Sequence, residues 1–338
     1  MTIMRRVVTM SIVGLMVGGA AVTAGLAWRQ ARARARDAER AGPAVAVDRA
    51  KTLKYLEDWA RRDRWDRFPE SPSFAFYNVY ATQALGGRVP VALRAKVVDY
   101  LQRCQGRDGG FTAAPDSGAS HVVPTLYALQ TLSLLDALDA IDRNGAATFL
   151  RALARPDGGY AGRPVEPDTS LGTTFHALAA LDALEAIDRV DADATVRYLS
   201  SHRTADGGFA LRRGMAASPR ATFMAVRSFK LLRKLDARTS DEVARHLASS
   251  RYSGRLREGK FSTLPEVEEE ENVLASLADL GRMDLVDRGN VERFVDGLYV
   301  PENGGFGPQP GVGTTPPSTY QAIACLVTLG RLPEPPRG

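Results

Sequence analysis

The chain has 338 residues, of which 44% are hydrophobic and 25% are charged, and it contains two cysteines. This composition supplies a full-sized hydrophobic core and excludes a disordered chain or a small disulfide-stapled domain. The formal net charge is +5, but residues 1–40 hold seven arginines against Asp37 and Glu39, so the remaining basic and acidic residues cancel. A neutral body lacks the basic footprint that nucleic-acid binding requires, and we expect no nucleic-acid partner.

The first predicted element is an apolar segment near the N-terminus. No charged residue interrupts the stretch from Val7 to Trp28. A helix of this length rises roughly 33 Å, enough to cross a hydrocarbon core of about 30 Å. We therefore predict a single-pass membrane anchor and an Arg/Ala-rich linker within residues 1–46. A cleaved secretory signal behind Arg5 and Arg6 is the alternative, and arginines on both sides of the span leave the side of the membrane open.

A repeat follows this segment. The motif Asp108–Phe111, of sequence Asp-Gly-Gly-Phe, recurs 49 residues later as Asp157–Tyr160 and after another 49 as Asp206–Phe209. A related copy, Asn303–Phe306, lies two periods further on, and the skipped position falls at the worn copy Tyr252–Gly254. Paired glycines favour tight turns, and a repeat of this length is typical of a helical array.

Each repeat pairs an amphipathic stretch, such as Val91–Cys104, with one that is apolar almost all round, such as Val122–Leu135. A helix that is apolar on all sides is expected to be buried on all sides, so the pairs predict an outer and an inner layer. The six predicted pairs are 48–62 with 74–85, 92–104 with 122–135, 143–154 with 171–183, 191–201 with 217–234, 239–249 with 267–281, and 287–298 with 316–330.

Neither end of this array has the polar capping repeat that an open array needs. We therefore predict an all-α fold, a closed (α/α)6 toroid of six helical hairpins over residues 47–332. A short Pro-rich tail follows at residues 333–338.

The segment Ser120–Leu129, the turn Asp157–Tyr160 and the stretch Thr173–Leu178 together resemble the β subunit of protein prenyltransferases. The Gly-Gly-aromatic turns are also similar to those of squalene-hopene and class II terpene cyclases. The resemblance covers about residues 48–332. It implies the toroid, an isoprenoid or related lipid in a central cavity and, for a prenyltransferase, a partner subunit.

The resemblance to prenyltransferases also implies a zinc ion held by an Asp-x-Cys element and a histidine. These positions fall near Val267–Glu269 and near Ser318, where neither cysteine nor histidine is present, so zinc is not predicted and no metal ligand is assigned. The diphosphate contacts of the family imply Arg220, Arg257 and Lys260 as substrate-binding residues. Arg255, Arg257 and Lys260 precede the fifth inner helix, and solvated surface is the alternative for these three cations.

An acidic run, Glu266–Glu271, opens the predicted fifth inner helix. The helix dipole favours acids at this end, which alone could explain the run. Its spacing also resembles the Asp-x-Asp-Asp motif of class II cyclases, which implies Glu266, Glu268 and Glu269 as candidate catalytic acids. Crowded carboxylates raise one another's pKa, so one of them can stay protonated and donate a proton. Mg²⁺ bound to these carboxylates is the alternative, and the cofactor is otherwise unknown.

Three further residues are candidates for substrate binding. His121 begins the second inner helix at a position that resembles a histidine of the prenyltransferases, where it either reaches the cavity mouth or caps the helix. Tyr127 and Tyr320 fall on inner helices, where aromatic rings can line a pocket for a prenyl chain or face a carbocation. His176 lies inside an apolar run and is predicted to be a core residue.

Three functions follow from these features. The first is a membrane-tethered, prenyltransferase-like toroid that binds an isoprenoid or related lipid, possessing a divergent transferase activity without the usual zinc site. The second is a class II terpene-cyclase-like enzyme that uses the acidic run Glu266–Glu271. The third is a non-catalytic toroid that binds a lipid, peptide or protein partner.

Overall fold

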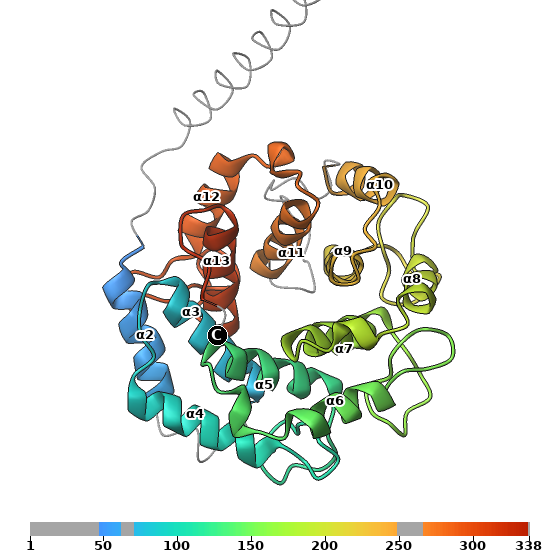
Figure 1. Ribbon diagram of the computed structural model, residues 1–338. Coiled ribbons are helices and arrows are strands. Elements are labelled where there is room, and N and C mark those ends of the chain that lie inside the picture. Colours follow the sequence, from blue (N-terminus) through green and yellow to red (C-terminus); the bar gives the residue numbers. More distant parts are fainter. Residues whose placement is uncertain (1–46, 62–70, 249–265, 337–338) are drawn as a thin grey trace, which may run out of the picture.

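A computed structural model describes residues 47–61, 71–248 and 266–336 (Figure 1). Apart from short 3-10 turns and isolated bridges, the regular structure of these residues is α-helical. The inner helices are α3 (Pro72–Ala84), α5 (Val122–Leu134), α7 (Leu171–Ala183), α9 (Pro219–Leu231), α11 (Glu266–Asp279) and α13 (Pro316–Thr328). The outer helices are α2 (Arg49–Arg61), α4 (Val91–Cys104), α6 (Arg143–Ala152), α8 (Ala192–Ser200), α10 (Ala237–Ala248) and α12 (Arg288–Leu298).

The inner helices form a closed ring. Each packs against the next inner helix in the chain, and α13 packs against α3 (Figure 1). The outer helices surround this ring, and their apolar faces contribute to the core while their other faces meet solvent. The predicted closed (α/α)6 toroid is therefore confirmed, together with the assignment of the all-apolar stretches to the inner layer.

All six inner helices run in the same direction. Residues at equivalent positions of neighbouring inner helices meet: Tyr77 contacts Tyr127 and Tyr320, Phe175 contacts Phe223, and Arg220 contacts Glu268. At the other end, the side-chain amide of Gln83 in α3 donates to the carbonyl of Leu134 in α5. The ring thus has an N-terminal mouth, where the inner helices begin, and a C-terminal mouth, where they end.

Each Gly-Gly-aromatic turn follows one outer helix in the chain and packs against the next outer helix. Gly158 adopts a left-handed backbone with φ +88°, and a Cβ atom placed there would lie 2.3 Å from the carbonyl oxygen of Ala194 in α8. Only glycine allows both this backbone and this close approach. In the last repeat, Gly304 lies in the same way against Lys51 of α2, so the outer layer closes as well.

The aromatic residue of each turn is fixed by a threonine that the sequence analysis did not single out. Its backbone N–H donates to a fully buried threonine hydroxyl in the following inner helix. The four pairs are Phe111 with Thr125 (2.9 Å), Tyr160 with Thr174 (3.0 Å), Phe209 with Thr222 (3.1 Å) and Phe306 with Thr319 (3.0 Å). A buried N–H without a partner would be costly, so these bonds set the position of each inner helix relative to its turn.

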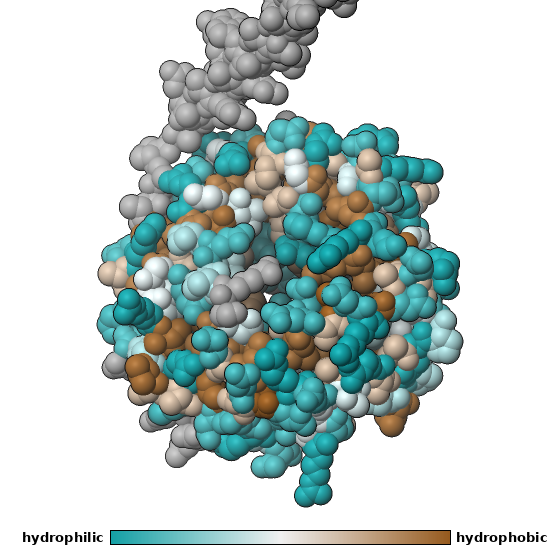
Figure 2. Space-filling view, in the orientation of Figure 1, coloured by the Kyte–Doolittle hydropathy of each residue, from teal (hydrophilic) through white to brown (hydrophobic). Residues whose placement is uncertain are grey.

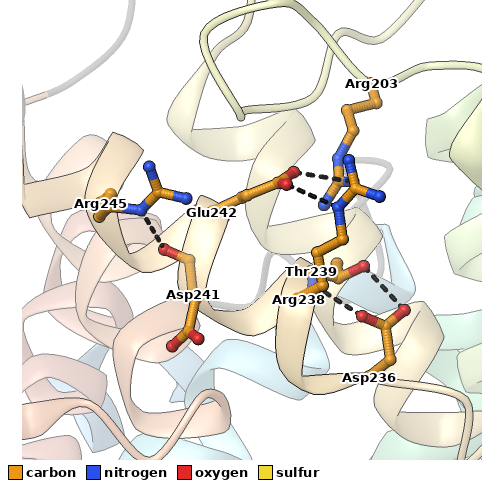
Figure 3. Close-up of polar contacts among 7 residues, drawn as sticks. All are labelled: Arg203, Asp236, Arg238, Thr239, Asp241, Glu242 and Arg245. Atoms are coloured by element: carbon orange, nitrogen blue, oxygen red, sulfur yellow. Dashed lines mark hydrogen bonds and ion pairs between the residues drawn. The ribbon is translucent and has the colours of Figure 1, made fainter.

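Charged side chains join the third of these turns to helix α10 (Figure 3). Arg203, next to the turn, lies 3.0 Å from Glu242, which Arg238 also contacts at 2.9 Å. Asp236 accepts the backbone N–H of Thr239 at the beginning of the helix, at 2.7 Å. Exposed pairs of this kind contribute little each, but the half-buried Arg203 connects two repeats.

Within the described residues, no helix is long and apolar enough to cross a membrane. The predicted span Val7–Trp28 and its linker lie outside these residues, as does the worn turn Tyr252–Gly254.

Candidate functional site

The inner faces of α3, α5 and α13 bring five aromatic side chains together, which we call the aromatic wall. The ring of Tyr77 stacks on that of Tyr320 with centroids 4.8 Å apart, and its hydroxyl donates to the hydroxyl of Tyr127 at 3.4 Å. Phe76 and Tyr80 also contact Tyr320, with centroids 5.4 and 5.1 Å away. The two predicted tyrosines, from helices distant in sequence, thus belong to one wall.

Helices α9 and α11 present charged side chains instead, which we call the polar wall. Near the N-terminal mouth, the guanidinium of Arg220 lies 3.6 Å from the carboxylate of Glu268. Near the C-terminal mouth, Asp279 is almost fully buried and lies 2.6 Å from Nε of Arg227 and 2.7 Å from Nζ of Lys230. The polar wall therefore holds two groups of paired charges, one at each mouth.

Glu271 lies on α11 between these two groups. Arg227, whose charge acts on Glu271, pairs with Asp279, and Arg220 pairs with Glu268. Among the described residues, no lysine, arginine or histidine lies within ion-pair distance of Glu271. Within that part of the chain, this carboxyl group consequently has no cation of its own.

Burial raises the pKa of Glu271 to about 7, and the charges of Glu268 and Asp279 act in the same direction, whereas Arg227 opposes them. Glu271 in turn raises the pKa values of the neighbouring hydroxyls of Tyr80 and Tyr320, for which burial is the larger cause. At neutral pH, a large fraction of Glu271 is thus an uncharged carboxylic acid, surrounded by uncharged tyrosines.

The two walls are close enough for their charges and hydroxyls to affect one another, since Glu271 raises the pKa values of Tyr80 and Tyr320. Glu271, Tyr127 and Tyr320 are neither fully buried nor fully exposed, although each lies on an inner helix of the ring. Figure 2 shows the molecular surface hollowed near the centre of the ring. A cavity with aromatic groups on one side and one uncharged acid on the other suits an apolar ligand with polarisable double bonds.

His121 lies at the N-terminal mouth, where it caps α5: its Nδ1 atom accepts the backbone N–H of Val123 at 3.1 Å. Burial and the charge of Arg163 lower the pKa of His121. Burial also lowers the pKa of His176 to about 4, and Arg220 and His121 are near enough to add to that effect. His121, His176 and Arg220 therefore gather at one mouth, and both histidines are neutral at pH 7.

The sequence-predicted site residues are thus only partly brought together. Arg220 and Glu268, predicted for different roles, pair with each other. Glu269 lies close enough to Glu270 to add to the effect of burial, which raises the pKa of Glu270 to about 7. Helix α11 begins at Glu266, whose side chain lies outside the description, and Arg257 and Lys260 lie outside the described residues.

Sequence reasoning gave no role to Arg227 or Asp279 and did not distinguish Glu271 within its acidic run. Helical spacing was the available signal. Arg227 lies seven residues after Arg220, and Asp279 lies eight after Glu271, so each pair shares a helix face.

The residues at the positions of the zinc ligands do not fit a zinc ion. Val267 is fully buried in the core, and the hydroxyl of Ser318 lies 2.8 Å from that of Thr315 at the start of α13. Glu268 pairs with Arg220, so no soft nitrogen or sulfur ligand is available at these positions. Over the described part of the chain, no three His, Cys, Asp or Glu side chains are arranged to hold a metal ion.

The raised pKa of Glu271 predicts a pH-dependent stability. A carboxyl group in the unfolded chain ionises with a pKa of about 4.3. Between this value and about 7, the native state keeps the proton of Glu271 and the unfolded state does not, so stability is lost as pH rises through this window. Glu271→Gln lacks this titration. Urea unfolding should show the variant gaining about 1–3 kcal/mol relative to the wild type between pH 5 and pH 7.5.

The exposed control Glu302→Gln should follow the wild type across the same pH range. A Glu271→Gln variant that also follows it would show that Glu271 titrates normally.

A closed ring of α-helical hairpins around a lined cavity defines an α/α toroid. The chain belongs to the prenyltransferase alpha-alpha toroid domain family, whose model matches residues 47–260 and 272–335.

Solved structures with the same fold include protein geranylgeranyltransferase-I from Candida albicans, complexed with GGPP, at 16% identity and a TM-score of 0.72 over 85% of this chain and 93% of that chain. A variant of the type II terpene cyclase MstE from Scytonema, in complex with its product merosterolic acid A, is 13% identical with a TM-score of 0.57, over 84% and 96% of the two chains. Another MstE variant, in complex with its substrate geranylgeranyl dihydroxybenzoate, is 11% identical with a TM-score of 0.54, over 83% and 95%. At these identities the likeness concerns the fold alone.

Proposed function

We propose that this protein binds an isoprenoid in its central cavity and protonates it there, in the manner of a class II terpene cyclase, with Glu271 as the acid. The observation that supports this is the position of Glu271: within the described residues this carboxyl group has no ion pair, its pKa is raised, and it lies near Tyr80 and Tyr320 of the aromatic wall. The proposed acid thus belongs to the same acidic run as the sequence-predicted Glu266, Glu268 and Glu269 but is a later residue.

The reaction would begin with transfer of the carboxyl proton of Glu271 to a carbon–carbon double bond of the ligand. A carbocation forms, and the electron pair of a second double bond closes a ring by forming a carbon–carbon bond. Loss of a proton from the product then restores the proton balance, so the product is an isomer of the substrate. The faces of Tyr77, Tyr320 and Phe76 would stabilise the cation, because aromatic rings attract positive charge.

Asp279 would act as a positioning residue in this reaction. By pairing with Arg227 at 2.6 Å, it keeps this guanidinium from neutralising Glu271. An arginine paired directly with Glu271 would lower the pKa of that carboxyl and remove its proton at neutral pH.

A divergent transferase is the second candidate, and the cluster at the N-terminal mouth favours it. Arg220 and His121 lie where a diphosphate could meet the beginnings of several inner helices, and Arg257 and Lys260 would add charge. Such a transferase would act without the usual zinc site and, by its resemblance, with a partner subunit. In both cases the segment Val7–Trp28 would tether the toroid to a membrane that supplies the lipid.

The test is to incubate the full chain in D2O with farnesyl diphosphate, geranylgeranyl diphosphate and squalene, with and without Mg²⁺, and to analyse the products by chromatography and mass spectrometry. Protonation by the protein predicts a product of new retention time that carries one added deuterium. Release of diphosphate and a need for an acceptor would favour the transferase instead. Ligand that is bound but recovered unchanged would favour a non-catalytic binding protein and overturn the proposal.

A further inference from the structure

Three loops that precede inner helices carry large apolar side chains at exposed positions. Val165, before α7, is 89% exposed, Met215, before α9, is 56% exposed, and Val312, before α13, is 43% exposed. Only one other large hydrophobic residue in the described part of the chain is exposed, Val91 of α4. The three loop residues occupy comparable places in three repeats, which distinguishes them from scattered surface residues.

The three loops surround the N-terminal mouth. Each supplies a backbone carbonyl that accepts the N–H of a residue at the beginning of an inner helix: Gly162 accepts from Val122 (3.0 Å), Leu211 from Leu171 (3.4 Å) and Pro308 from Val267 (3.3 Å). Because all the inner helices begin at this mouth, the exposed apolar side chains belong to one rim, which we call the apolar rim (Val165, Met215 and Val312).

The loop tips are open to solvent. A Cβ atom built at Gly214, Gly311 or Gly313 would meet no other atom within 4 Å. Arg212 and Arg213 are exposed and lie three and two residues before Met215 in the chain. Separate apolar tips with adjacent arginines suit the interface of a bilayer, where apolar groups enter the acyl region and arginines reach headgroups.

The first described helix begins close to the turn that leads to the Val312 loop. The structure begins at residue 47, and Lys51 of α2 donates to the carbonyl of Pro301, in the turn that leads to the Val312 loop. The predicted span Val7–Trp28 precedes this helix in the sequence, so the predicted membrane anchor is continuous with an element that contacts the turn before the Val312 loop.

We infer that the N-terminal mouth docks on a lipid bilayer, with Val165, Met215 and Val312 inserted at its surface. The mouth then opens towards the acyl chains, and a membrane-dissolved isoprenoid enters the cavity without crossing water. This inference extends the proposed function by naming the route of its ligand, but its test needs no turnover.

The experiment uses the full chain in phosphatidylcholine vesicles, with and without phosphatidylserine. Val165→Cys, Met215→Cys and Val312→Cys are labelled singly with an environment-sensitive fluorophore, and nitroxide-bearing lipids serve as quenchers. Val91→Cys is the control, since Val91 is 85% exposed, close to the value for Val165, but lies on the outer helix α4. The native Cys104 and Cys325 are buried and should stay unlabelled.

Quenching at the three rim positions should exceed that at the control by about twofold or more, and phosphatidylserine should strengthen it. Met215→Asp combined with Val312→Asp should reduce the quenching of a label at position 165, since a charge opposes insertion. Weak quenching at all four positions, or equal quenching at the rim and the control, would overturn the docking. Loss of turnover in vesicles with quenching intact would instead count against the proposed chemistry alone.

Discussion

Glu271→Gln is expected to lower the rate of isoprenoid protonation by about 10²–10⁴-fold, because an amide has no acidic proton to donate. The substitution keeps the size and the uncharged state of the side chain, so the fold and the binding of the ligand should be retained. The measurement is the rate of deuterium incorporation into product at saturating substrate, with circular dichroism and thermal unfolding as checks on folding.

Glu268→Gln is the matched variant, one turn away on the same helix. It breaks the contact with Arg220, 3.6 Å from Glu268, but leaves the proposed acid in place, so its effect should fall mainly on KM. The assignment of the acid fails if Glu271→Gln keeps the wild-type rate. It also fails if Glu268→Gln alone abolishes the reaction, which would return that role to a sequence-predicted residue.

Gly158→Ala is expected to destabilise the toroid by about 3 kcal/mol or more. The added Cβ would lie 2.3 Å from the carbonyl oxygen of Ala194, at a backbone φ of +88° that alanine rarely adopts. The neighbouring atoms belong to the backbone of α8, so the strain cannot be relieved by rotating a side chain. Urea unfolding at constant pH measures the loss.

Gly214→Ala separates the two causes of this loss. Gly214 also has a left-handed backbone, with φ +80°, but no atom lies within 4 Å of its added Cβ. Only the conformational cost of about 1–2 kcal/mol is expected there. Equal losses in the two variants would contradict the role we give to contact between the turn and the next outer helix.

The architecture could be predicted from the sequence because its signals are local and repeated. The spacing of the turns Asp108–Phe111 and Asp157–Tyr160, with an all-apolar stretch after each, is enough to indicate two helical layers. The lack of polar capping repeats at either end of the array predicted that the ring closes, and the packing of α13 on α3 confirms this closure. The threonines that bond to the turn aromatics escaped notice, since a buried threonine looks like any other helix residue in sequence.

The site was less predictable because its properties depend on contacts between distant residues. Comparison with the Asp-x-Asp-Asp motif favoured Glu266, Glu268 and Glu269. Nothing in the local sequence distinguishes these glutamates from the others of the acidic run Glu266–Glu271. The cation of Arg220 is instead engaged by Glu268, 48 residues away. Likewise Arg227, whose charge lowers the pKa of Glu271, pairs with Asp279, two turns after Glu271 on the same helix. No local sequence pattern shows which carboxylate pairs with which arginine.

The last turn contacts the first helix, so the repeats of the toroid are not expected to fold one after another along the chain. The hydroxyl of Thr52 in α2 donates to the carbonyl of Gly304, 252 residues away, and α3 needs α13 on one flank. An open solenoid can gain or lose terminal repeats one at a time. In this ring, the first hairpin has no complete packing surface until the last has been synthesised. Folding should therefore be slow and cooperative, and removal of either terminal hairpin should expose the core rather than shorten the array.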